Sequence, residues 1–213
     1  LDDSNIDSNY ACTYYPWVKT FDSENNQYIY LPPTKDVVKN FAYTDNTAYP
    51  WFPAAGYSRG QISGVNPKKV LKLSEQDELY GGRINFINKF ASEGMRIWGD
   101  KNLQVTESQM NRISKRRLLV RIRKLLSIAC IGLIFDPNDN TTVKSFKSAV
   151  EPILDDIRNK RGLTDYRIEV DDSQEARDRL ELPAKIYLKL QPNLEYIDIS
   201  FVITPSGANF DDV

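Results

Sequence analysis

Two long stretches of helical periodicity limit what this chain can fold into more than any other feature. Residues 106–133 and 142–161 both repeat apolar side chains at the spacing of one helix face. The first stripe consists of Leu118, Ile122, Leu125, Ala129 and Leu133, and the second of Val143, Phe146, Ala149, Val150, Ile153, Leu154 and Ile157. Because an apolar stripe must be buried against another element, the sequence predicts two core-facing helices.

Segments with the two-residue period of strands follow the helices. We predict strands at about 165–170, 184–190 and 195–203, where apolar side chains alternate with mostly polar ones. Each strand therefore offers one face to a core. The pattern as a whole predicts an α/β (α+β) fold, in which the two helices cover a mixed sheet built from these three strands and earlier ones.

The ends of the two helices carry local signals. Thr106, followed by Gln109 three residues later, predicts a capping box at the start of the first helix. Pro152 lies inside the second helix and predicts a kink, and Gly162 predicts its end.

The segment "FDPNDN" (135–140) between the helices has two interpretations. An EF-hand calcium loop opening at Asp136 requires glycine at its sixth position and glutamate at its twelfth. Those positions hold Thr141 and Lys147, and a lysine cannot ligate a cation. We therefore interpret the segment as a turn between two helices, and the chain predicts no metal site.

The first half of the chain is less regular. We predict strands at 10–15 and 27–31, a helix from Thr34 to about 44, and an irregular passage rich in proline and glycine at 48–64. A helical segment at 75–93 and a short strand "MRIWG" (95–99) follow. We predict two units, 1–104 and 105–213.

The composition excludes several classes of function. The chain of 213 residues has no histidine, which removes Ser-His-Asp and Cys-His catalysis and HExxH zinc sites. Its net charge of −1 creates no overall attraction to nucleic acid or membrane. Cys12 and Cys130 lie in apolar contexts that suit reduced, buried thiols.

Residues 125–135 form the longest apolar stretch and are too few to span a bilayer, so we expect no direct membrane insertion. The start "LDDSNIDSN" lacks an initiator methionine and a signal peptide, so we expect a fragment or processed piece of a longer protein.

Charged clusters raise two rival hypotheses. The first helix carries a basic face, residues 112–124, which offers an alternative function as a nucleic-acid-binding module. It is not interleaved with stacking aromatics, and most such charge runs are solvated or paired with neighbours. The carboxylate pairs at 155–156, 171–172 and 211–212 lack a nearby nucleophile or cofactor motif. We therefore expect surface charge, no enzyme activity and no cofactor.

The order of short motifs along nearly the whole chain resembles one family, the contractile tail sheath proteins of myovirus-type phages, in their carboxy-terminal part. The motifs are "YYPW" (14–17), "LPPT" (31–34), "WFPAAG" (51–56), "INFINKF" (84–90), "IWGDKNL" (97–103), "RISKRRLL" (112–119), "FDPNDN" (135–140) and "YIDISFVITPSGANF" (196–210). "FDPND" is similar to the family's Phe-Glu-Pro-Asn turn, with Asp136 in place of glutamate. Phe86 stands where family members often have proline.

The resemblance implies a mechanical function. It implies a structural subunit that polymerises into stacked hexameric rings around a tail tube and contracts to drive the tube through the host envelope. The implied partners are neighbouring sheath subunits, the tail tube protein, and baseplate and tail terminator proteins, with no nucleic acid. The implied location is the virion, after assembly in the host cytoplasm. A non-phage contractile injection system is an alternative, and amino-terminal domains are expected beyond this chain.

The resemblance also implies two sets of contact residues. In this family an extended terminal arm adds a strand to a neighbouring subunit. The candidates for that inter-subunit strand are Tyr196, Ile197, Ile199, Phe201, Ile203 and Phe210. One carboxy-terminal helix of related sheaths touches the tube, and it corresponds to residues 142–161. Its candidates for tube binding are Lys144, Lys147, Arg158 and Lys160.

Overall fold

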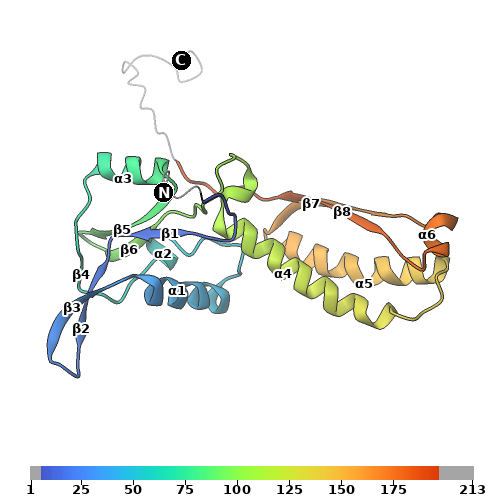
Figure 1. Cartoon of the computed structure of the whole chain (residues 1–213), viewed down its shortest axis with the longest axis horizontal. Coiled ribbons are helices and arrows are strands. Elements are labelled where there is room, and N and C mark those ends of the chain that lie inside the picture. Colours follow the sequence, from blue (N-terminus) through green and yellow to red (C-terminus); the bar gives the residue numbers. More distant parts are fainter. Residues whose placement is uncertain (1–5, 197–213) are drawn as a thin grey trace, which may run out of the picture.

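The computed structural model describes residues 6–196 and consists of helices and short strands in an α+β arrangement (Figure 1). The predicted fold class is confirmed. The strands are β1 (Thr13–Tyr15), β2 (Val18–Asp22), β3 (Gln27–Leu31), β4 (Asn66–Pro67), β5 (Ile84–Phe90), β6 (Gly94–Trp98), β7 (Leu163–Val170) and β8 (Ala184–Leu190). The α-helices are α1 (Thr34–Thr47), α2 (Gly56–Arg59), α3 (Leu73–Gly81), α4 (Ile113–Cys130), α5 (Asn140–Asn159) and α6 (Gln174–Asp178).

The prediction of one mixed sheet under the two long helices is wrong for the described residues. Their strands form three separate sheets, ordered β1-β5-β6, β3-β2-β4 and β7-β8. β1 runs parallel to β5, whereas the other pairs are antiparallel. Only β7-β8 lies against α4 and α5 (Figure 1). The predicted strand at 195–203 falls mostly outside the described residues, and Glu195 and Tyr196 lie in irregular backbone.

Two hydrophobic clusters hold these elements together. One joins α1, β2, β5 and β6 through side chains such as Ile87 and Ile97. The other joins the predicted stripes of α4 and α5 to β7 and β8, and Leu118, Val150 and Leu154 have no exposed surface there. Trp51, from the irregular passage, also belongs to this second cluster. Both long helices therefore bury the apolar face that the sequence predicted.

The two-stranded β7-β8 sheet alternates as predicted. Ile168, Ile186 and Leu188 pack against the helical cluster, whereas Arg167 and Tyr187 are exposed on the opposite face. Among the described residues, β7 and β8 pair only with each other. Each strand therefore has a free edge with backbone groups available for pairing.

The predicted capping box at Thr106 is wrong. Ser108 caps a short 3₁₀ turn instead, accepting a hydrogen bond from the Met110 N–H, and α4 begins at Ile113. The backbone is extended at Arg112, which forms a β-bridge with Lys101. This pairing between distant segments overrides the local capping signal.

The turn interpretation of residues 135–140 is confirmed. The Asp139 carboxylate accepts hydrogen bonds from the N–H groups of Thr141 and Thr142, both at 2.9 Å, and so caps α5. The helix therefore starts at Asn140, two residues before the predicted start.

α5 ends at Asn159 by a motif in which Arg161 takes the left-handed conformation, with φ of 63°. The Gly162 N–H then donates to the Ile157 carbonyl. A Cβ at residue 162 would lie 2.6 Å from the Ile157 Cγ2 atom, so this position requires glycine because of close packing.

The prediction of helix over residues 75–93 is only partly right. α3 ends at Gly81, and residues 84–90 form the central strand β5. β5 pairs with β1 on one side and β6 on the other, and Asn85, Ile87 and Asn88 are buried. The sequence did not reveal β2, which forms a hairpin with β3. Thr34 makes no side-chain capping hydrogen bond at the start of α1.

Shortening the buried Leu118 should destabilise the chain strongly, because it leaves a cavity between α4 and α5. We expect Leu118→Ala to lower the free energy of unfolding by about 2–5 kcal/mol in urea denaturation followed by circular dichroism. Ile128→Ala, on the same helix but 62% exposed, is the matched control and should change it by less than about 0.5 kcal/mol. Equal effects of the two substitutions would contradict the burial of this helix face.

Candidate assembly surfaces

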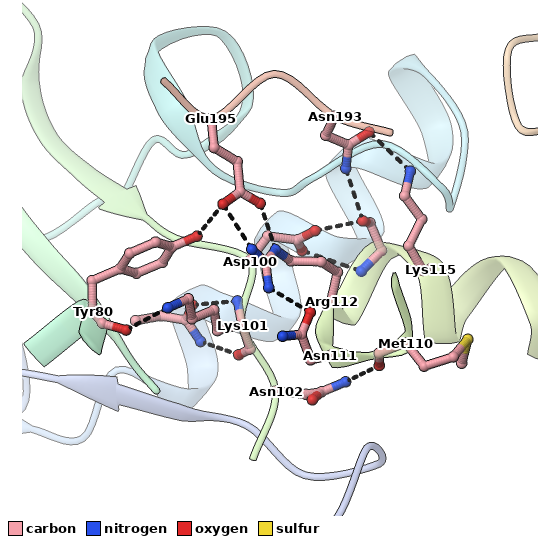
Figure 2. A network of polar contacts seen from close by, with 12 residues as sticks. Tyr80, Asp100, Lys101, Asn102, Met110, Asn111, Arg112, Lys115, Asn193 and Glu195 are labelled. Carbon is pink, nitrogen blue, oxygen red and sulfur yellow. Dashed lines mark hydrogen bonds and ion pairs between the residues drawn. The ribbon is translucent and has the colours of Figure 1, made fainter. Parts of the chain in front are cut away.

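A network of polar contacts fixes the segment that follows β8 to the start of α4 (Figure 2). The Asn193 side chain donates to the Ser114 hydroxyl oxygen at 3.1 Å and accepts from the Lys115 ammonium at 2.9 Å. Two residues further on, Glu195 accepts hydrogen bonds from the Arg112 guanidinium and, at 2.9 Å, from the Tyr80 hydroxyl. Residues 193–195 are thus tied to both α3 and α4. We call this group the arm-root network.

The protonation states in the arm-root network support these contacts. Burial opposes ionisation of Glu195, but its hydrogen bonds and charge attraction to Arg112 outweigh burial and lower its pKa. Burial raises the pKa of Tyr80 well above its ordinary value, and the nearby Glu195 charge raises it further. At neutral pH the carboxylate is therefore ionised and accepts, while the phenol keeps its proton and donates.

Asp100 lies buried beneath the network and holds the first turn of α4. Its carboxylate accepts from the Ser114 backbone N–H at 3.1 Å and from the Ser114 hydroxyl, and its carbonyl accepts from the Ile113 N–H at 2.8 Å. Burial raises the pKa of Asp100 to about 6, although the Ser114 hydrogen bonds and the Lys115 charge act in the opposite direction. The carboxyl thus satisfies the Ser114 N–H at the start of the helix, at a cost in desolvation.

The candidates for the inter-subunit strand lie almost entirely outside the described residues. Only Tyr196 is described, and its side chain is 75% exposed directly after the arm-root network. Ile197, Ile199, Phe201, Ile203 and Phe210 lie outside the description.

The candidates for tube binding do not form one set. At about 100° per residue, Lys144, Lys147 and Arg158 project within about 60° of one another, beside the apolar stripe of α5. Lys147 lies seven residues before the buried Leu154 and is half-buried, whereas Lys144 and Arg158 are exposed. Lys160 follows the end of the helix and projects elsewhere. Within residues 6–196, Lys144 and Lys147 have no ion pair.

The other two tube candidates already have partners. Arg158 pairs with Asp155 at 3.0 Å and lies over the Tyr166 ring. Lys160 pairs with Asp156 at 2.7 Å and lies over the Tyr49 ring. The Lys160 carbonyl also accepts a hydrogen bond from the Trp51 indole at 3.0 Å. Lys160 therefore serves the junction between α5 and the irregular passage.

The basic face of α4 is largely paired at its amino-terminal half, in line with the expectation for such charge runs. Arg112 pairs with Glu195, Arg116 stacks on Tyr10, and Arg117 pairs with Asp45. The remaining cations, Arg121, Arg123 and Lys124, are exposed and have no ion pair among the described residues. Sequence reasoning missed the partners because they lie tens of residues away, and no local pattern marks them.

Metal ligands, thiols and apolar helices were the other classes of feature considered in the sequence. No group of three or more His, Cys, Asp or Glu side chains within residues 6–196 could hold a metal ion. Cys12 and Cys130 are free, half-buried thiols, and burial raises the pKa of both. In the same part of the chain, no helix has the length and apolar character needed to cross a membrane.

Known proteins with a similar sequence share one description. The tail sheath protein of Vibrio phage KVP40 is 33% identical over 217 residues, covering 100% of this chain and 32% of that protein. The tail sheath protein of Enterobacteria phage T4 is 29% identical over 213 residues, covering 98% of this chain and 32% of that protein. Over its full length, the chain is therefore similar in sequence to part of phage tail sheath proteins. No profile of a protein family matches it.

A solved contractile sheath has a similar fold. The sheath complex of an extracellular contractile injection system in its contracted state superposes with a TM-score of 0.86 at 23% identity. The match covers 99% of this chain and 59% of that chain. The present chain spans about a third of the length of the curated relatives it matches.

The buried Asp100 should make the stability of the protein depend on pH. Between the ordinary value of 3.8 and about 6, the folded state binds a proton that the unfolded state has released. Stability should therefore decrease as the pH rises through this window and then level off. Relative to Asp100→Asn, we expect the native chain to lose on the order of 2–3 kcal/mol between pH 4 and 7.

Urea denaturation of both proteins at several pH values measures this difference. Asp172→Asn, which changes an exposed aspartate, controls for the loss of a carboxylate and should follow the native profile. A constant difference between the native chain and Asp100→Asn at all pH values would contradict the prediction.

Proposed function

We propose that this chain is part of a structural subunit of a contractile phage tail sheath, which polymerises around the tail tube and contracts to drive it through the host envelope. The observation that carries the proposal is similarity to phage tail sheath proteins over the full chain. The fold shared with a contractile injection sheath supports the same mechanical class. The work comes from subunit packing, and the subunit has no enzymatic role.

The proposed partners follow from the sheath assignment. They are neighbouring subunits in stacked hexameric rings, the tail tube, and the baseplate and tail terminator proteins. The proposed location is the phage tail, after assembly in the host cytoplasm. We also propose that residues 1–104 and 105–213 are two units of a carboxy-terminal part, a division that the two hydrophobic clusters support.

Negative-stain electron microscopy of the purified protein, with amino-terminal domains present, tests the assignment. We expect to see tubes or tube-free polysheath built of stacked rings. A protein that stays monomeric under all assembly conditions and instead binds nucleic acid with steep salt dependence would support the rival function of the basic face of α4.

The connection between subunits is proposed to be strand addition at the free edges of β7-β8. A two-stranded sheet is marginal by itself, and added strands extend its ladder without disturbing the buried face. The arm-root network supports this, because it fixes residues 193–195 to the body of the subunit. The residues from Ile197 onward are then proposed to reach a neighbour, with the apolar candidates Ile197, Ile199, Phe201 and Ile203 on the buried side.

Removing the arm should abolish assembly and leave the subunit folded. We expect a chain without residues 197–213 to give a near-native circular dichroism spectrum and to elute as a monomer. Ile199→Pro, which removes one backbone donor without shortening the arm, should also block assembly. Pro205→Ala is the matched control and should assemble normally. Sheaths of normal length from either of the first two variants would refute strand addition.

The contact with the tube is proposed to use the exposed face of α5, with Lys144, Lys147 and Arg158 meeting an acidic tube surface and Lys160 at its margin. Each exposed ion pair contributes only about 0–1 kcal/mol. Repetition over many subunits makes the total large, while each contact stays weak enough to be exchanged during contraction. The lack of ion pairs at Lys144 and Lys147 among the described residues supports this role.

Charge reversal tests the tube contact. Lys144→Glu, Lys147→Glu and Arg158→Glu together should prevent assembly on purified tubes while tube-free polysheath still forms, and each single change should have little effect. The matched control reverses three exposed cations on other elements, by Lys35→Glu, Lys39→Glu and Arg123→Glu. Unchanged co-assembly of the first variant at physiological salt would overturn the assignment.

A further inference from the structure

A cleft of about 440 Å³ lies between α4, α1 and the segment before β1. Its apolar surface includes Phe41, Pro50 and Ile113. The opposing cationic side is formed by one face of α4, with Arg116, Arg117, Arg121 and Lys124. The volume is in the range of sites that accept a ligand or a short peptide segment. We call this the basic cleft.

The charge of the basic cleft is strongly unbalanced. Asp45 is the single carboxylate among its described lining residues, and both of its oxygens accept from Arg117, at 2.6 and 2.7 Å. Arg116 stacks on the Tyr10 ring at 4.3 Å, which leaves its charge uncompensated. Arg121 and Lys124 are exposed, with no ion pair among residues 6–196. The cleft therefore presents an excess of positive charge above an apolar surface.

Two guanidinium groups of the cleft also keep unused hydrogen-bonding capacity. The Arg116 Nε and Arg117 Nη1 atoms are buried and have no acceptor among the described residues. A desolvated N–H group without an acceptor is costly, and more so on a charged group. An anionic ligand therefore gains both charge attraction and hydrogen bonds here.

We infer that the basic cleft binds an acidic chain segment carrying an aromatic side chain, and that this segment is Phe210-Asp211-Asp212 of a second copy of this chain. The chemistry matches, with an aromatic ring for the apolar surface and two adjacent carboxylates for the arginines. The inference rests on the proposed function, in which the arms cross between subunits.

Two adjacent carboxylates directly after an aromatic residue distinguish 210–212 from the other aromatic and acidic strings. The Asp22 carboxylate, beside Phe21, accepts three hydrogen bonds within its own hairpin turn. Phe135 is exposed beside Asp136, but Pro137 follows, so this string offers one adjacent carboxylate. The two carboxylates after Phe210 suit a site with several cations.

The geometry of α4 allows an arm to reach both sites on one neighbour. Leu118 and Ile122 belong to the hydrophobic cluster shared with β7 and β8, whereas the cations of the basic cleft project from other sides of the same helix. A helix with its side chains is about 10–12 Å across. The nine residues from 204 to 212 extend to roughly 30 Å, which is enough to pass from the proposed strand to the cleft.

Peptide binding to the full chain tests the inference directly. The probe is a fluorescent, amidated peptide of residues 204–213, "TPSGANFDDV", in which the two aspartates carry the only negative charges of the sequence. The receptor carries Phe210→Ala, Asp211→Asn and Asp212→Asn, so that its own arm does not compete. Saturable binding in fluorescence anisotropy is expected.

Matched variants decide whether the binding occurs in the cleft. Adding Arg121→Glu and Lys124→Glu to the receptor should weaken binding at least about tenfold. Arg123→Glu, on the same helix but outside the cleft, should leave affinity within about twofold of the parent receptor. A peptide with Phe210→Ala should also bind more weakly, which a purely ionic contact would not require.

The outcomes separate this inference from the sheath assignment. No peptide binding, or binding that the cleft variants leave unchanged, overturns the inference even if sheaths still form. Binding of a single-stranded DNA probe in the cleft, without peptide binding, likewise overturns it. Failure of the protein to polymerise, with peptide binding intact, instead counts against the proposed function alone.

Discussion

The first turn of α4 depends on a carboxylate that comes from another part of the chain. A helix start leaves N–H groups without partners inside the helix, and here Asp100 supplies acceptors for those of Ile113 and Ser114. The same stretch pairs through Lys101 with Arg112, so the helix cannot begin earlier. This contact fixes where α4 leaves the first part of the molecule, and therefore where the second hydrophobic cluster and the arm-root network lie.

Because α4 begins at this point, its different sides make different kinds of contact. Leu118 and Ile122 enter the cluster with α5 and β7-β8 and have almost no exposed surface. The cations on the opposite side either hold neighbouring segments or face solvent. The burial of apolar side chains contributes a large stabilisation. Each charged contact contributes little and can form and break.

The parts of the fold that follow local periodicity could be predicted from the sequence. The stripes of α4 and α5, the alternation of β7 and β8, and the turn at 135–140 all depend on residues within a few positions of one another. The prediction of helix over 84–90 is wrong. β5 is buried between two partner strands, so its apolar run lacks the clear two-residue alternation that would have indicated a strand. The predicted start of α4 at Thr106 is wrong because the β-bridge between Lys101 and Arg112 outweighs the local capping signal.

The candidate surfaces divide in the same way. Helix periodicity alone places Lys144, Lys147 and Arg158 on one side of α5, beside its apolar stripe. It does not reveal that Glu195 binds Arg112 and Tyr80, because these contacts join three elements distant in sequence. Nor does it show which arginines of α4 are already paired.

The arm-root network shows what partial burial contributes to an ion pair that anchors a chain segment. A fully exposed pair such as Arg179 with Glu181 holds neither side chain in one place, because solvent screens it and both chains lose conformational entropy. The pair of Arg112 and Glu195 leaves each side chain only 22% exposed, and Tyr80 adds a second donor to the same carboxylate. The attraction is therefore stronger and its geometry more fixed, while both charges still reach water. Such a contact can set the direction in which a chain leaves the subunit without the desolvation cost of a buried ion pair.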